Sequence, residues 1–350
     1  MMQCTPLSGT LFAVSATLYG SSYAGVAQGL KYFTAGVFQT FRMLFGLVFM
    51  AVIVITRVIF NKEYRQIARS HFTSGFKPIL LLLFGGLLNL AIPHCLTAVA
   101  QAWVASSIVQ LFQPFVPIFG SILSHFVLAD EKFNKQKALS LVLAVVGVVA
   151  SSVPSFLHGT DNGSSTSMLV LGYALTLISM ASFGFAPVWF KLKTPNVDES
   201  ISVCLQLAIS TVFEAIFGLI KDGPKNFANQ IVNAPPIAWM WPVIIGALVS
   251  GVAVYCLMAL ISMIGAFGAN LVPFGQMIVG VIVGVAVLNE WKGYVWWEIF
   301  LCVVGVLILC CSLIVGVWRK SPKEDKSEMS AHSIHEEEEQ RVEEPEIAEL

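Results

Sequence analysis

The sequence predicts an all-α integral membrane protein, with ten transmembrane helices arranged as two inverted five-helix repeats. Three observations lead to this fold class. Hydrophobic residues make up 56% of the chain and charged residues only 12%, whereas a soluble domain carries about 25% charged residues. Apolar runs of roughly 20 residues, the length that crosses a hydrocarbon core, recur along the chain. A sequence pattern in the first half then returns in the second half.

Ten apolar runs lie between charged residues or clusters of glycine, proline and asparagine, which tend to end helices. Because the runs are continuous rather than alternating, they predict helices. The expected spans are residues 9–30, 33–56, 78–99, 105–128, 136–156, 168–190, 199–220, 240–264, 269–288 and 294–318. The corresponding domains are a short cytosolic N-terminus (1–8), a first repeat (9–156), a second, inverted repeat (168–318) and an acidic, disordered cytosolic tail (319–350).

The internal repeat consists of a Pro-Phe pair, a glutamate and a Val-Val-Gly-Val tetrapeptide. Pro114 precedes Glu131 by 17 residues, and Pro273 precedes Glu290 by the same 17 residues. The tetrapeptide follows in the next apolar run of each half, at 145–148 and at 303–306. A membrane unit that occurs twice in one chain is typical of secondary transporters.

The basic residues predict the orientation of the helices. With the N-terminus in the cytosol, 15 of the 20 lysines and arginines are cytosolic, four are outside and Arg42 lies within a span. Five spans are an odd number, so the second repeat enters the membrane inverted relative to the first. The loop between spans two and three accordingly holds five basic residues, whereas the loop between spans seven and eight holds two.

Two ionisable residues fall deep within spans, where a charge costs about 2.5–3.5 kcal/mol on insertion scales. Arg42 in span two and Glu214 in span seven lie at similar depths from the outer side. They are either partners or line one aqueous pathway; the alternative is that each snorkels or bonds to backbone carbonyls independently. If a proton is coupled to transport, Glu214 is the candidate carrier.

Polar side chains gather near three prolines, Pro114, Pro117 and Pro273, which we expect to break helices four and nine and so to mark a substrate region. Amides, phenols and an indole without paired cations suit a neutral or zwitterionic solute, although each could also serve interhelical hydrogen bonding. The predicted substrate-binding residues are Gln110, Gln113, Asn89, Trp103, Tyr19, Tyr23, Tyr255, Asn270 and Gln276. No cofactor and no metal site are expected.

These residues resemble the drug/metabolite transporter (DMT) superfamily, most closely its EamA-type ten-helix transporters. The resemblance rests on Phe38 and Arg42 in the second helix, a proline-bearing fourth helix ending in Glu131, and a fifth helix with a central glycine. It covers residues 9–318, although the second half carries Glu214 rather than an arginine. It implies alternating access around a central cavity lined mainly by helices three, four, eight and nine.

The function expected from the sequence is therefore secondary transport of a small neutral or zwitterionic organic solute, of the amino acid or metabolite type. A nucleotide-sugar or phosphorylated-metabolite carrier of the same superfamily is the first alternative, and a structural or receptor-like membrane protein is the second. An enzyme is not expected, because the spans contain no aspartate and no catalytic constellation. Nucleic acid is not an expected partner either.

The remaining expectations concern location and partners. Both termini are predicted to be cytosolic, with plasma membrane and endomembrane left open. Asn162, in a sequon within an outer loop, is predicted to be glycosylated in a eukaryotic host. A small-molecule substrate and the lipid bilayer are the expected partners, and a coupling proton and a homodimer are left open.

Overall fold

The computed structural model describes residues 5–73, 75–104, 109–110, 112–128, 135–158, 166–194, 197–286 and 292–317. Glu131, Glu290 and the sequon residue Asn162 lie outside these ranges. Within the ranges every regular element is helical, which confirms the all-α prediction for them. The helices are α1 (Pro6–Gly29), α2 (Ala35–Phe60), α3 (Lys62–Thr73), α4 (Phe76–Gly86), η1 (Leu87–Ala91), α5 (Ile92–Ala100), α7 (Phe115–Val127), α8 (Lys135–His158), α9 (Thr166–Lys193), α10 (Glu199–Asp222), α11 (Pro224–Asn233), η2 (Pro236–Trp239), α12 (Met240–Ile244), η3 (Ile245–Ala253), α13 (Val254–Ala269), α14 (Val272–Ala286) and α15 (Trp296–Val317).

Five helical segments are long and apolar enough to cross a membrane on their own, and four shorter apolar helices accompany them. Together they coincide with nine of the ten expected spans. The remaining span is occupied by α1, whose buried face carries serines and glycines among its apolar residues. The long segments are Ala35–Phe60, Phe76–Ala100, Ser167–Lys193, Glu199–Asp222 and Pro236–Ala269; the shorter ones are Phe115–Val127, Ala138–Ser151, Val272–Val285 and Trp296–Ser312.

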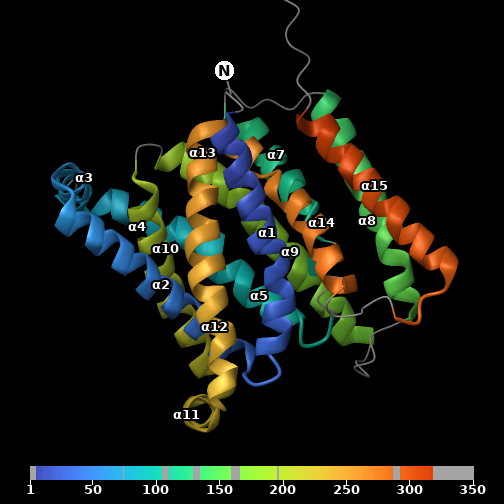
Figure 1. Cartoon of the computed structure of the whole chain (residues 1–350), viewed down its shortest axis with the longest axis horizontal. Coiled ribbons are helices and arrows are strands. Elements are labelled where there is room, and N and C mark those ends of the chain that lie inside the picture. The colour runs from blue at the N-terminus through green and yellow to red at the C-terminus, as the bar shows by residue number, and fades with distance from the viewer. Residues whose placement is uncertain are drawn as a thin grey trace, which may run out of the picture.

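Two short helices, α3 and α11, occupy regions that were expected to be loops. They lie at opposite ends of the bundle (Figure 1). At the first end of α2, the backbone N–H of Thr34 donates to Gln230 Oε1 of α11 at 2.7 Å; at its other end, Asn61 Oδ1 accepts from the N–H of Tyr64 in α3 at 3.0 Å. Because the 26 residues of α2 span about 39 Å, α3 and α11 are a membrane thickness apart.

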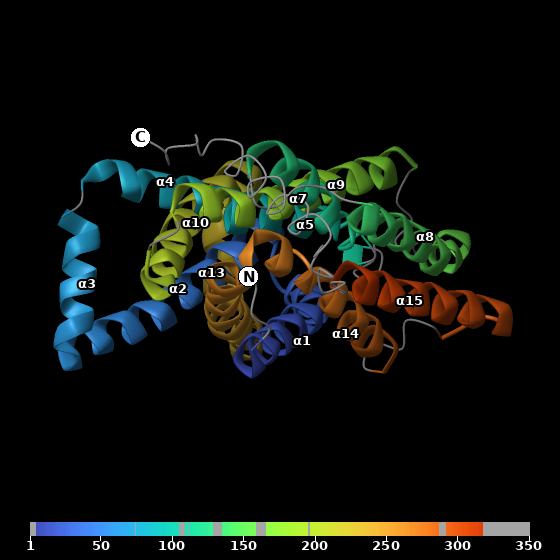
Figure 2. The same ribbon diagram turned by 90° about the horizontal axis from the view of Figure 1, so that it is seen from above.

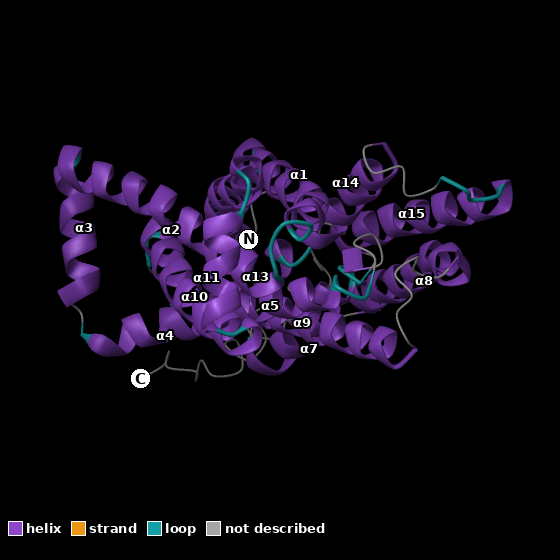
Figure 3. Ribbon diagram, turned by 90° about the horizontal axis from the view of Figure 1, so that it is seen from below, coloured by secondary structure: helices purple, strands orange, loops and turns teal. Residues whose placement is uncertain are grey.

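The helices α8 and α15 form an antiparallel pair that projects from one side of the bundle (Figures 2 and 3). Ser140 Oγ donates to the carbonyl of Ser312 at 2.8 Å, and Ser312 Oγ donates to the carbonyl of Ser140 at 2.6 Å. The backbones approach closely at Gly147, where a Cβ would lie 2.8 Å from the carbonyl oxygen of Gly305. These two glycines are the central glycines of the repeated Val-Val-Gly-Val tetrapeptide, so the tetrapeptide serves helix packing.

Two π-helical segments interrupt corresponding spans of the two halves. The segment η1 separates α4 from α5 in span three, and η3 separates α12 from α13 in span eight. π-helical turns widen the helix locally and occur frequently at functional sites. Asn89 lies in η1 and Ser250 lies in η3, and both make buried side-chain hydrogen bonds.

Pro114, Pro117 and Pro273, which were predicted to break helices four and nine, lie at or next to the beginnings of α7 and α14. Pro114 precedes the first residue of α7, Pro117 lies in the first turn of α7, and Pro273 is the second residue of α14. The first turn tolerates proline because its N–H groups have no partner within the helix. These prolines therefore mark where helices start, whereas Pro187 lies inside α9.

A polar cluster joins α2, α3 and the beginning of α10. The hydroxyl of Tyr64 donates to Asp198 Oδ1 at 3.0 Å and lies 2.7 Å from Ser200 Oγ. Arg57 donates to Ser200 Oγ at 2.9 Å, pairs with Asp198 at 3.9 Å and lies over the Tyr64 ring, 3.9 Å from its centroid. Asp198 also caps α10 by accepting from two backbone N–H groups.

Replacing Tyr64 with phenylalanine should lower the free energy of unfolding by about 1–2 kcal/mol, because Asp198 loses a buried donor. Burial raises the pKa of Tyr64 to about 12 from 10.0. The phenol's contribution is therefore complete below pH 10 and is lost as the pH rises toward 12. Thermal unfolding in detergent at pH 7 measures the loss. Tyr32→Phe, at a largely exposed tyrosine, is the control; equal losses in both variants would contradict the prediction.

Candidate functional site

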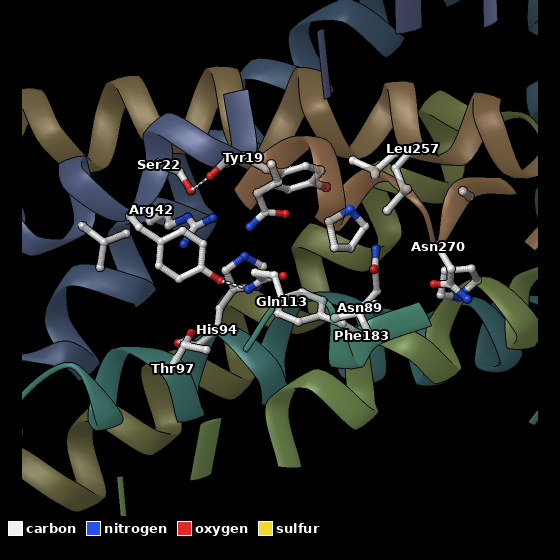
Figure 4. Close-up of a pocket in the computed structure, with 18 of the residues that line it drawn as sticks. Tyr19, Ser22, Arg42, Asn89, His94, Thr97, Gln113, Phe183, Leu257 and Asn270 are labelled. Atoms are coloured by element: carbon white, nitrogen blue, oxygen red, sulfur yellow. Dashed lines mark hydrogen bonds between the residues drawn. The ribbon is translucent and has the colours of Figure 1, made fainter. Parts of the chain in front are cut away.

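A polar cavity lies among helices from both halves of the chain (Figure 4). It holds about 670 Å³ of empty space, its opening included. The first half contributes residues of α1, α2, η1, α5 and the beginning of α7, and the second half contributes α9, α13 and α14. Spans three, four, eight and nine thus line the cavity as the family resemblance implies, and spans one, two and six join them.

The cavity brings together six of the nine residues predicted to bind substrate. They come from four different spans, and Figure 4 shows Tyr19, Asn89, Gln113 and Asn270 around one space. Pro273 and Arg42 also line the cavity, whereas Pro114, Pro117 and Glu214 do not. The six are Tyr19, Tyr23, Asn89, Gln113, Asn270 and Gln276.

The other three predicted residues do not line the cavity. Gln110 is buried against Gly280 of α14, where a Cβ would collide with its amide. Trp103 packs with Val104 and Val109 beside Tyr23. Tyr255 packs at the edge of the large apolar cluster of the bundle. Gln110 and Tyr255 are on lining spans and Trp103 lies in the turn after α5, but all three face other neighbours, which helical spacing alone could not reveal.

The amides of the cavity are held by hydrogen bonds to other spans. Gln113 Nε2 donates to the hydroxyl of Tyr23. Asn89 Nδ2 donates to Gln206 Oε1 at 2.7 Å, and Asn270 Nδ2 donates to the carbonyl of Gly184 at 3.3 Å. These bonds fix the side chains on the cavity wall, which favours a preorganised site.

Arg42 is almost completely buried, with 2% of its surface exposed, and it lines the cavity. Its Nε donates to Ser250 Oγ at 2.9 Å, and one terminal nitrogen donates to Gln39 Oε1 at 3.4 Å. The backbone of η3 also approaches the backbone of α2 closely here, because a Cβ on Gly246 would lie 2.4 Å from the carbonyl oxygen of Arg42. Two residues of η3, one turn apart, therefore position this arginine.

Glu214 is fully buried in α10, and neither of its carboxyl oxygens has a hydrogen-bond partner. Arg42 and Glu214 do not form a direct hydrogen-bonded pair in this conformation, because both carboxyl oxygens of Glu214 lack a partner. The guanidinium of Arg42 is instead held by two neutral side chains.

Several lining residues were not predicted. Gln39 lies one helical turn before Arg42, a spacing that could have identified it. Phe183 and Pro187 on α9 carry no comparable signal in the sequence. The ring of Phe183 contacts His94 edge to face at 5.2 Å, and His94 Nδ1 lies 2.8 Å from the carbonyl of Leu90. Over the ranges that the structure covers, no three histidine, cysteine or acidic residues gather as metal ligands do.

Comparison with known proteins agrees with this architecture. The model of the EamA-like transporter family matches residues 7–153. These residues are therefore similar to those of EamA-like transporters. The uncharacterized transporter YvbV of Bacillus subtilis (strain 168) is 28% identical over 138 residues, which cover 39% of this chain and 42% of the length of YvbV. Both matches confirm the resemblance to the drug/metabolite transporter superfamily.

The fold of nearly the whole chain has a counterpart among solved structures. One crystal structure superimposes with a TM-score of 0.61 at 13% sequence identity, covering 89% of this chain and 98% of the other. This likeness concerns the fold alone. Together with the apolar helices, the family match supports an integral, multi-pass membrane protein.

Proposed function

We propose that this EamA-like chain is a secondary transporter that moves a small neutral or zwitterionic organic solute by alternating access. The observation that carries the proposal is the cavity, which is buried, polar and lined by residues of both halves. A carrier needs such a shared site between two units that can move against each other. Amides and phenols dominate its polar lining, with Arg42 as its charged side chain among the described residues. A phosphorylated solute would favour several cations.

The inverted repeat and its ten crossings are part of this proposal, and the packing of the helices supports them. The helix α2 of the first half packs against η3 of the second half, and α10 of the second half packs against η1 of the first. Arg42 and Gln206 each occupy the eighth position of their helix, and each bonds to the π-helical segment of the opposite half. Gln206, rather than Glu214, therefore corresponds to Arg42. These reciprocal contacts are what an inverted relation between the two repeats, 9–156 and 168–318, would produce.

Cysteine labelling tests the inverted arrangement directly. Cysteines introduced at Ser70 in α3 and at Asn229 in α11, in a chain whose own cysteines are replaced, should react with a membrane-impermeant maleimide from opposite faces of the bilayer. Lys and Arg counts place α3 on the cytosolic face and α11 outside. Replacing Ala68, which is buried in α3, gives an unreactive control. Labelling of both positions from one face would refute the inversion.

Transport itself is tested with purified protein in proteoliposomes. We expect uptake or exchange of at least one radiolabelled solute from a panel of amino acids, nucleobases and small metabolites, above the rate of protein-free vesicles. Binding without any translocation across the panel would instead favour a receptor-like role. Coupling to protons through Glu214, a homodimer, and glycosylation at Asn162 in an outer loop remain parts of the proposal that need separate tests.

A further inference from the structure

The charge of the cavity is unbalanced. Arg42 is the lining residue with a permanent charge, and no aspartate or glutamate lines the cavity in the part of the chain that the structure describes. Its counterpart in the second half is a neutral amide, Gln206. A buried guanidinium without a counter-ion is costly, and a bound anion offsets that cost.

Arg42 also retains free bonding capacity. A guanidinium has five N–H donors in a planar fork that matches a carboxylate. Ser250 and Gln39 engage Nε and one terminal nitrogen, and the second terminal nitrogen has no bond to any described residue. Both partners are neutral, so the positive charge of Arg42 is held in place without being neutralised.

A second unpaired group lies on the cavity wall. Gln101 lines the cavity, and its side-chain oxygen is buried without a hydrogen-bond partner. A buried acceptor left unpaired destabilises the site. An N–H or O–H group of a bound solute would satisfy it. The cavity thus offers one cationic donor and one vacant acceptor.

We propose that the solute is a small carboxylic acid whose carboxylate binds Arg42 and whose amino or hydroxyl group donates to Gln101. This inference rests on the proposed transport function and makes a carboxylate obligatory: amino acids fall within its zwitterionic class, whereas hydroxy acids, which are anions at neutral pH, extend it. Amino acids and hydroxy acids share the recognised chemistry. The unpaired charge of Arg42 supplies the selectivity, and Ser250 and Gln39 set its orientation.

The test compares α-amino and α-hydroxy acids with their own primary amides as ligands of the purified, full-length protein, using thermal stabilisation to rank affinity. At least one acid should bind about 10- to 100-fold more tightly than its amide, the range expected for a hydrogen-bonded charge. Arg42→Gln should abolish the preference, and Arg42→Lys should retain it with weaker binding. Arg69→Gln, at an exposed position on α3, should leave the preference unchanged.

A measurement on the wild type guards against misfolding of the Arg42 variants. Acetate should compete with the bound acid, whereas acetamide at the same concentration should not. The proposal is overturned if amides bind as well as acids, if acetamide competes equally, or if no acid of the panel binds. Uptake of the preferred acid into proteoliposomes distinguishes failure of the transport proposal from failure of the carboxylate proposal. Acid-selective binding without uptake would refute transport and leave carboxylate recognition intact.

Discussion

Replacing Gly246 with leucine is expected to destabilise the protein by about 3 kcal/mol. A Cβ at this position would lie 2.4 Å from the carbonyl oxygen of Arg42 and 3.0 Å from the amide nitrogen of Gly46. Backbone atoms cannot rotate away as side chains can, so η3 and α2 must separate. The separation would also displace Ser250 from Arg42 and should weaken acid binding.

The matched control is Gly9→Leu, because a Cβ on Gly9 meets nothing within 4 Å. Thermal unfolding followed by the fluorescence of the eight tryptophans compares the two variants with the wild type. A melting temperature for Gly246→Leu equal to that of Gly9→Leu would show that the close approach of α2 and η3 is not a feature of the protein in solution.

Removing the carboxyl group of Glu214 is expected to stabilise the fold and to abolish proton-driven uptake. Both carboxyl oxygens are buried without partners, so Glu214→Leu should raise the free energy of unfolding by about 1–3 kcal/mol. Most substitutions in a buried site destabilise a protein, and an increase would therefore be diagnostic. If Glu214 carries the coupling proton, Glu214→Gln should eliminate accumulation driven by a pH gradient while leaving exchange of solute intact.

Uptake is measured in proteoliposomes with and without an imposed pH gradient, beside a counterflow assay that needs no gradient. Glu63→Gln, in the first turn of the exposed helix α3, supplies the control for removal of a carboxylate. Gradient-driven accumulation that survives in Glu214→Gln would eliminate Glu214 as the proton carrier. A loss of stability in Glu214→Leu would indicate that the carboxyl group has hydrogen-bond partners in the folded protein, which contradicts the prediction.

The composition, the apolar runs and the internal repeat were enough to predict a helical membrane protein, and most of the described apolar helices begin and end within a few residues of the expected spans. Membrane helices can be located this well because every backbone polar group must be satisfied within the span, which leaves a long apolar segment in the sequence. Six of the nine substrate candidates line the cavity. They could be selected from the sequence because a polar side chain inside an apolar run is costly unless it has a structural or functional role.

The direction in which each side chain points was decided by tertiary packing. Gln110 and Gln113 lie on one helix face in sequence terms, yet Gln113 reaches the cavity and Gln110 is enclosed by Gly280. The pairing of Arg42 with Ser250 rather than Glu214 depends on the close approach at Gly246. Hydropathy indicates how deep in the membrane a residue of a helix lies. The rotation of that helix about its axis depends on contacts with segments distant in the sequence, which a local pattern does not predict.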